Sequence, residues 1–159
     1  MNTDFIKKQA SVLELDKILE KLSQYASIPD AAEECSSLLP SFNKFEVETR
    51  LSHTSDAYML ISRFGAPSFG GAGNCNNALE RAKMDGVLSM GELLNIARLL
   101  HVIRSVKEWK EHSSGSVITS LDGFFATLTP NRYFEDKIFS SIDSEEEMND
   151  RASQKLADI

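Results

Sequence analysis

The sequence contains few of the residues that build disulfide frameworks, metal centres or membrane spans. It has only two cysteines, Cys35 and Cys75, and three histidines, and neither HExxH nor CxxC spacing occurs. No apolar run approaches the ~20 residues of a membrane span, and no signal-peptide pattern opens the chain. We therefore expect a cytoplasmic protein that holds no metal and whose cysteines are small buried apolar residues.

Nucleotide-binding and catalytic motifs are missing as well. A Walker loop needs a glycine followed by lysine and then serine or threonine, so that amides, an ammonium and a hydroxyl converge on phosphate and magnesium. None of the eight glycines precedes a lysine, and His53, His101 and His112 are scattered along the sequence. The sequence predicts no catalytic residue, no cofactor and no small-molecule substrate for this chain.

The sequence also has fewer basic residues than acidic ones. Seventeen basic residues face 24 acidic ones, for a net charge of −7, and the segment 133–150 alone holds seven acidic residues and one lysine. Strong autonomous binding to nucleic acid requires clustered lysine and arginine, which this balance disfavours. Three consecutive glutamates at 145–147 are interpreted as a solvated loop, because their side chains point in different directions.

One predicted helix nevertheless carries spaced cations. These are Arg98, Arg104, Lys107 and Lys110, with two glutamates interleaved. Such spacing is typical of a solvated helix surface. Its functional interpretation is a weak contact with DNA or ribosomal RNA.

What the sequence does contain is amphipathic helical patterning along nearly its whole length. Its 159 residues, 42% of them hydrophobic, are about the length of one domain and suffice for an ordinary core. We therefore expect an all-α, multi-helix, bundle-like single domain over residues 1–159. Helices are predicted at 11–26, 30–39, 43–65, around 79–82, from 89 to the turn at 113–116, at 117–129 and at 131–139.

Local signals mark where these helices begin and end. The predicted N-terminal caps are Ser11, Asp30, Asn43, Ser89 and Asn131, and Gly65 is the predicted stop of the third helix. Ser89 with Glu92 has the spacing of a capping box.

The helical pattern is interrupted near the C-terminus. Met148 and Asn149 are expected to form a short extended segment, after which Ala152 and Ser153 open a final helix that has no stop signal before Ile159. This ending favours a fragment of a longer protein.

A glycine-rich loop, Phe69–Asn74, joins two of the helical patterns. Gly70, Gly71 and Gly73 permit backbone conformations that other residues rarely adopt, and no part of this loop fits a helix. We interpret it as a structural connector rather than a phosphate site.

The order of these elements resembles the MutS family, in its second bacterial branch (MutS-II), whose full-length members end in an Smr nuclease domain. The resemblance rests on the glycine loop followed by Ala78–Ala82 and by the capped helix after Gly86. The segment 13–19 is similar to that branch's opening helix, and 150–156 is similar to the passage from the core into the lever and clamp helices. Gly73-Asn74 departs from the usual Arg-Asp pair of the family.

The resemblance implies an N-terminal core domain that breaks off at the start of the lever and clamp helix. The intact parent would be a homodimeric ATPase that uses ATP and magnesium, carries an Smr endonuclease domain, binds branched DNA, suppresses homologous recombination and acts on stalled ribosomes. This chain would couple the ATPase to the clamp and would not itself be an enzyme. The alternative is a self-contained helical module for protein–protein interaction.

Overall fold

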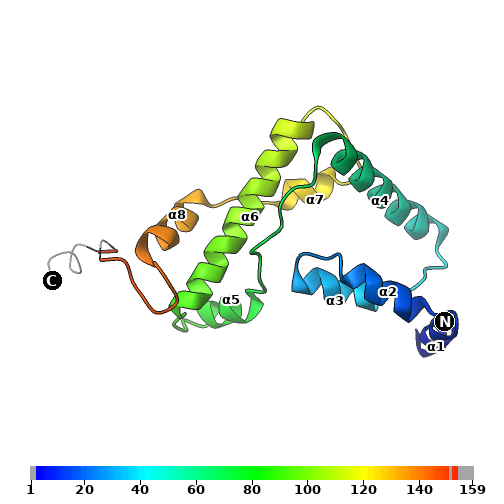
Figure 1. The fold of residues 1–159 in the computed structure, drawn as a ribbon, viewed down its shortest axis with the longest axis horizontal. Helices are drawn as coiled ribbons and strands as arrows, with labels where there is room; N and C mark the ends of the chain where they lie inside the picture. Colours follow the sequence, from blue (N-terminus) through cyan, green and yellow to red (C-terminus); the bar gives the residue numbers. More distant parts are fainter. Residues whose placement is uncertain (1–2, 151, 154–159) are drawn as a thin grey trace. The chain divides into compact units, whose positions relative to one another are not determined.

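The computed structural model describes residues 3–150, 152 and 153, and these residues form eight α-helices and no named strand (Figure 1). The all-α expectation is confirmed. The helices are α1 (Thr3–Val12), α2 (Leu15–Ser23), α3 (Pro29–Ser37), α4 (Lys44–Phe64), α5 (Asn76–Lys83), α6 (Met90–Ser114), α7 (Asp122–Thr127) and α8 (Arg132–Ser141). None of these described helices is both long enough and apolar enough to cross a membrane.

The chain divides into two compact units. The N-terminal unit consists of the described residues up to Ala66 together with Ile118–Asp122, and the C-terminal unit consists of Pro67–Val117 and the described residues from Gly123 onward. A compact unit is a packing feature and need not be a domain. The expectation of one domain over residues 1–159 therefore stays a prediction.

The prediction of a single helix at 11–26 is wrong, because Glu14 breaks it. Glu14 has φ 60° and ψ 27°, in the left-handed region, which cannot continue a right-handed helix. Ser11 lies inside α1 instead of capping a helix, and its carbonyl oxygen accepts a hydrogen bond from the amide of Glu14 at 3.0 Å. The Glu14 carboxylate is bound by Lys17 Nζ at 2.6 Å, one turn into α2.

The helix predicted at 30–39, which is α3, starts and ends earlier than predicted. Pro29 occupies its first position, which suits a fixed φ and a missing amide hydrogen, so Ile28 is the cap and Asp30 lies in the first turn. The helix ends at Ser37 instead of Leu39. Leu38 is already extended, at φ −58° and ψ 137°, and Pro40 disfavours helical geometry at Leu39.

The ends of α4 are as predicted. Asn43 Oδ1 accepts a hydrogen bond from the amide of Glu46 at 3.2 Å, and Gly65 closes the helix at φ 78°. Leu60, on α4, is 1% exposed and is the one buried hydrophobic residue among those described in the N-terminal unit.

The C-terminal unit is organised around α6. The capping box of Ser89 and Glu92 opens this helix, and Asn131 caps α8 by accepting a hydrogen bond from the amide of Phe134 at 3.1 Å, both as predicted. α8 packs against α6 through a hydrophobic cluster. Its buried members are Leu94, Ala97, Ile138 and Ile142, with Met90, Leu93 and Ile96 against them.

The predicted helix at 117–129 is shorter than expected, because α7 begins only at Asp122. The hydroxyl of Thr119 donates to Asp122 Oδ1 at 2.8 Å and accepts from the amide of Leu121 at 3.3 Å. Such side-chain bonds to nearby groups compete with helix formation. The stretch before Asp122 is therefore a turn despite its apolar spacing.

The acidic stretch after α8 forms a loop closed by an isolated antiparallel bridge between Ile142 and Met148, and Met148 is one of the two residues that the sequence predicted to be extended. The three glutamates at 145–147 are exposed in this loop, as predicted, and Glu145 lies over Gly91, where a Cβ would be 3.3 Å from the Glu145 Cδ. Ala152 and Ser153 form a bend, and the rest of the predicted final helix lies outside the described residues.

Candidate functional site

The most distinctive polar feature of the described residues is a carboxylate buried between α6 and α8. Glu135, in the first turn of α8, is only 2% exposed. Its position on the helix explains this burial, since Glu135, Ile138 and Ile142 follow one another at helical spacing and all three are buried. A buried carboxylate requires partners, and α6 supplies them.

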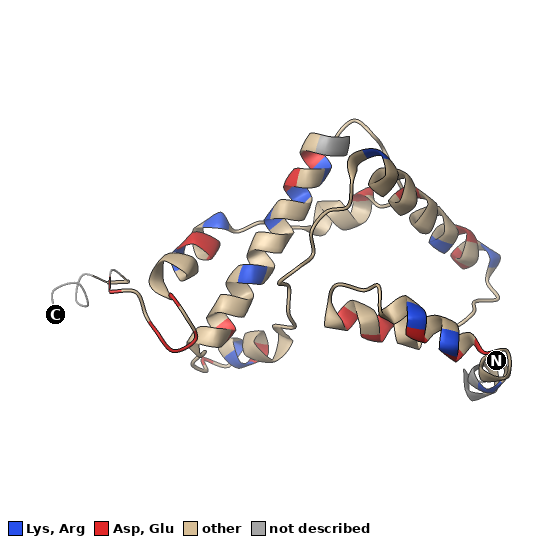
Figure 2. Cartoon of the chain, viewed as in Figure 1, with Lys and Arg blue, Asp and Glu red and all other residues tan. Residues whose placement is uncertain are grey.

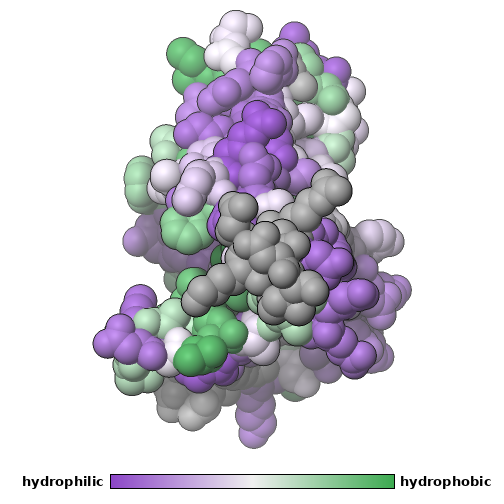
Figure 3. Space-filling view, turned by 90° about the vertical axis from the view of Figure 1, so that its left-hand side faces the viewer, coloured by the Kyte–Doolittle hydropathy of each residue, from purple (hydrophilic) through white to green (hydrophobic). Residues whose placement is uncertain are grey.

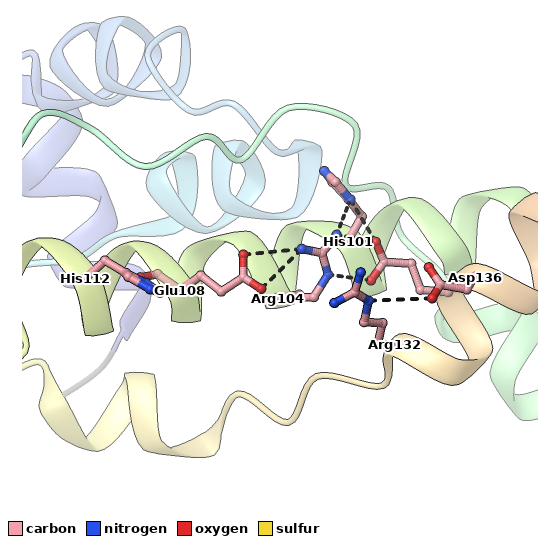
Figure 4. Close-up of polar contacts among 7 residues, drawn as sticks. His101, Arg104, Glu108, His112, Arg132 and Asp136 are labelled. Atoms are coloured by element: carbon pink, nitrogen blue, oxygen red, sulfur yellow. Dashed lines mark hydrogen bonds and ion pairs between the residues drawn. The ribbon is translucent and has the colours of Figure 1, made fainter.

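Two side chains of α6, Arg104 and His101, bind Glu135, and both are labelled in Figure 4. Arg104 donates from Nε to Oε2 at 2.9 Å and from Nη2 to Oε1 at 2.7 Å, which is the bidentate geometry that a guanidinium offers to a carboxylate. His101 Nδ1 lies 2.8 Å from Oε1. The hydrogen bonds from Arg104, with a smaller contribution from His101, lower the pKa of Glu135 to about 2 against burial, which raises it.

Arg104 joins this carboxylate to a second one. Its Nη1 donates to both oxygens of Glu108, one turn further along α6, at 3.2 and 3.3 Å. Both sets of hydrogen bonds raise the pKa of Arg104, those from Glu135 most, so it stays charged. His101 Nδ1 also lies 3.0 Å from Arg104 Nη2, and it can accept from Arg104 or donate to Glu135, depending on whether Nδ1 carries a hydrogen.

The charged cluster is suited to hold two helices in position and not to catalyse a reaction. Glu135 is ionised at neutral pH and its oxygens already accept hydrogen bonds from Arg104, so it is poorly suited to act as a general base. The cluster fixes α8 on α6 with defined geometry. Within the described part of the chain, no three His, Cys, Asp or Glu side chains are gathered in a way that would hold a metal ion.

The four cations that the sequence singled out do not form one exposed patch. Figure 2 shows basic residues spaced along α6, but Arg98 is exposed, Arg104 and Lys107 are half-buried, and Lys110 is buried. Arg98 Nη1 donates to Asn95 Oδ1 at 2.9 Å, and Lys107 Nζ donates to the carbonyl of Leu128 at 3.0 Å. A solvated helix surface is therefore the wrong description for part of this face, while weak contact with nucleic acid stays a prediction.

Lys110 shows most clearly that these cations serve the fold. Its ammonium donates to the carbonyl of Val117 at 2.8 Å and lies 5.6 Å from the ring centroid of Phe125. The ring of Trp109 packs on the same Phe125, with the two centroids 6.1 Å apart. The charge of Lys110 is thereby satisfied by a backbone carbonyl and an aromatic face.

The three loop glycines differ in what they do. Gly71 has φ 88°, which favours glycine, whereas Gly70 and Gly73 do not have positive φ and a Cβ would meet nothing closer than 3.8 Å. The loop is anchored by Ala72 and Cys75, both buried. Cys75 fits the prediction of a small buried residue, while Cys35 is half-buried, and both are free thiols.

Sequence reasoning missed the most buried member of the charged cluster. It placed Glu135 in a general acidic segment, although an acidic residue on the apolar face of a helix signals a buried pair. An imidazole within an apolar helix is more often hydrogen-bonded and partly buried. His101 Nδ1 lies within hydrogen-bond distance of Glu135 Oε1, but its side chain is 54% exposed.

The fold and this cluster define an all-helical chain whose charged residues hold helices together. No protein-family model matches the chain. It is similar to curated proteins named endonuclease MutS2, being 32% identical over 154 residues to that of Clostridium beijerinckii, 33% over 158 to that of Acetivibrio thermocellus and 36% over 157 to that of Ruminiclostridium cellulolyticum. Each alignment covers 96% of this chain.

The chain spans about a fifth of the length of these curated relatives, with 19 or 20% of each relative aligned. It is therefore MutS2-like in sequence, in agreement with the resemblance of its three sequence blocks. The name endonuclease describes proteins about five times as long.

Proposed function

We propose that this chain is the N-terminal core of a MutS2-type protein and that it acts as a helical body coupling an ATPase to a DNA clamp, with no chemistry of its own. The observation that carries the proposal is the alignment, which spans 96% of this chain and a fifth of each relative. The remaining four fifths of such a protein provide room for the ATPase and endonuclease activities.

The C-terminal unit has features that a mechanical role requires. α6 has 25 residues and is therefore about 37 Å long at 1.5 Å per residue. The bidentate pair of Arg104 and Glu135 would break if α8 slid along α6, because its geometry tolerates little displacement. A displacement applied at one helix would therefore move the other with it.

In this proposal the intact parent supplies the remaining functions. It would be a homodimer that uses ATP and magnesium, binds branched DNA or the ribosome, suppresses recombination and cleaves through an Smr-type domain. Two findings on this chain support the assignment, namely its similarity to MutS2 proteins and its all-helical fold.

The test begins with the reading frame downstream of residue 159 and continues with the encoded protein. We expect the frame to continue into a Walker motif, and we expect Arg104→Met combined with Glu135→Leu to slow ATP-driven release of a branched DNA while basal ATP hydrolysis is unchanged. The matched control is Glu46→Leu with Arg50→Met, an exposed ion pair on α4. A frame that stops, or ATP hydrolysis or DNA cleavage by the purified chain that a point mutation within it abolishes, would refute the proposal.

Nucleic-acid contact through α6 is tested separately. The chain should bind duplex or branched DNA only weakly at physiological salt, given its net charge of −7. Arg98→Gln is the informative variant, because Arg98 is exposed whereas Arg104 and Lys107 support packing. Submicromolar, salt-sensitive binding that Arg98→Gln weakens would show that this face binds DNA.

A helical interaction module is the second candidate, and one observation favours it. The N-terminal unit exposes many large hydrophobic side chains, and α2 and the segment after α3 line a groove of about 470 Å³ through Leu15, Leu19, Leu38, Leu39 and Pro40. Figure 3 shows hydrophobic residues among hydrophilic ones on the face that it draws. A complete reading frame ending at Ile159 would favour this candidate over the first.

A further inference from the structure

The segment Ile118–Asp122 has an unusual place in the fold. It lies in sequence between α6 and α7 and is flanked on both sides by residues of the C-terminal unit, yet it packs within the N-terminal unit. The rest of that unit is residues up to Ala66. Some interaction must therefore hold these five residues against a part of the chain that lies far away in sequence.

Asp56 of α4 supplies the polar part of that attachment. Its Oδ2 accepts a hydrogen bond from the amide of Ser120 at 2.7 Å and another from the Ser120 hydroxyl, also at 2.7 Å. The two residues are 64 positions apart. Hydrogen bonds to an ionised carboxylate are shorter and stronger than neutral ones, so a single serine is well anchored.

The segment is shaped in advance for this contact. Asp122 accepts hydrogen bonds from the amide and the hydroxyl of Thr119, at 3.2 and 2.8 Å, and the Thr119 hydroxyl in turn accepts from the amide of Leu121. None of these local bonds uses the amide or the hydroxyl of Ser120, and both of these donors bind Asp56. The turn can therefore keep its form when it leaves α4.

The segment is covered only in part. Ile118 is 91% exposed, Ser120 is exposed, and Leu121 is half-buried. The charged groups that act on the Asp56 carboxylate are His53, which favours its ionised form, and Asp122, which opposes it. The two hydrogen bonds described between the segment and α4 thus join one carboxylate to one serine.

We propose that Ile118–Asp122 is a releasable strap, fastened to α4 by the Asp56 carboxylate through Ser120, and that it opens while α4 stays folded. The strap is a two-state element of the α6–α7 connection. When it is fastened, the connection is fixed to α4, and when it is open, the connection is free of α4 while Phe125 of α7 keeps its contacts with Trp109 and Lys110 of α6.

Amide hydrogen exchange of the full chain, measured by NMR at neutral pH, tests this proposal. In the wild type, the Ser120 amide should exchange at least about tenfold more slowly than in an unstructured peptide, because exchange requires the Asp56 bond to open. Asp56→Asn should remove most of this protection, and Ser120→Ala should remove part of it, because its amide remains. Ser120→Glu should release the strap more fully than Ser120→Ala, because it sets a second negative charge against Asp56.

The controls separate strap release from unfolding. Ser140→Ala makes the same chemical change at a serine whose hydroxyl donates to the carbonyl of Lys137 within α8, and it should leave Ser120 exchange unchanged. Amides of α4 report on the helix itself. The proposal is refuted if the Ser120 amide is unprotected in the wild type, if its exchange is unaffected by Asp56→Asn and Ser120→Ala, or if the α4 amides accelerate together with it.

Discussion

The two compact units bury their hydrophobic residues to very different extents. Among the described residues, the C-terminal unit buries nine hydrophobic side chains together with Lys110 and Glu135, whereas the N-terminal unit buries Leu60 alone. Both units consist of amphipathic helices. The comparison teaches that an apolar stripe in the sequence predicts a helix but does not say how completely that stripe is covered.

The exposed residues of the N-terminal unit make the same point. Tyr25, Phe45 and Tyr58 are 86%, 78% and 75% exposed, so their rings contribute little burial to the stability of this unit. A fully buried Leu, Ile or Val side chain contributes about 1.5–3 kcal/mol, and the C-terminal unit buries five of these against one in the N-terminal unit. We therefore expect the N-terminal unit to open at lower free energy than the C-terminal unit.

The largest expected effect in this comparison comes from Arg104→Ala. It leaves the Glu135 carboxylate buried without its main partner, and breaking a buried pair in this way costs about 3–5 kcal/mol. Urea unfolding followed by the fluorescence of Trp109, the sole tryptophan, measures the free energy of unfolding of the C-terminal unit, which contains Trp109 and this cluster.

The control for that prediction lies in the N-terminal unit. Arg50→Ala removes an exposed ion pair with Glu46 on α4 and should cost about 1 kcal/mol or less. Equal losses in the two variants would show that burial of Glu135 has little energetic consequence. Arg104→Met combined with Glu135→Leu should recover much of the loss, because it removes both charges.

A second pair of variants tests whether the two units unfold separately. Leu60→Ala and Leu94→Ala each create a cavity at a buried leucine and should each cost about 2–5 kcal/mol locally. Leu94→Ala should lower the urea midpoint seen by Trp109 fluorescence. Leu60→Ala should lower the midpoint seen by far-ultraviolet circular dichroism and leave the Trp109 signal in place. If Leu60→Ala shifts both signals equally, the two units unfold as one and the comparison fails.

Acid should weaken the C-terminal unit through Glu135. Its pKa is lowered from 4.5 to about 2 on folding, so the unfolded state binds this proton more readily. The stabilisation is complete above the unfolded pKa and is lost as pH falls from about 5 towards 2. The Trp109-detected urea midpoint should fall across this range, and the slope should be smaller in Glu135→Gln. Identical slopes would mean that other carboxylates account for the acid sensitivity.

Local signals in the sequence predicted part of this structure correctly. Asn43, Ser89 and Asn131 cap their helices as predicted, because a cap is decided by a side chain and an amide three residues away. The left-handed Glu14 was not predictable in this way, since the leucines around it keep a helical spacing. The left-handed φ and ψ of Glu14 are a property of the backbone, and the spacing of apolar residues does not predict them.

The charged cluster was harder to predict from the sequence, because its members meet only through tertiary contacts. Arg104 was singled out in the sequence as a surface cation, but its partner Glu135 lies 31 positions away on another helix. Lys110 is likewise buried against a carbonyl and an aromatic ring beyond the end of its own helix. Which cations face solvent is decided by how helices pack, and one sequence does not contain that information directly.

The smallest expected effect concerns glycine, and it compares one position in each unit. Gly71 in the C-terminal unit and Gly65 in the N-terminal unit both have positive φ, at 88° and 78°, with nothing within 4 Å of where a Cβ would lie. Alanine at either position should lower stability by about 1 kcal/mol through backbone strain alone. Gly73→Ala is the matched control, since its site is equally open and its φ is not positive, so it should be neutral or slightly stabilising. Thermal melts of the three variants measure this, and Gly70→Ala should behave like Gly73→Ala. Unchanged midpoints for Gly70→Ala, Gly71→Ala and Gly73→Ala, together with lost binding of DNA, nucleotide or ribosome in the full-length parent, would instead identify the loop as a ligand site.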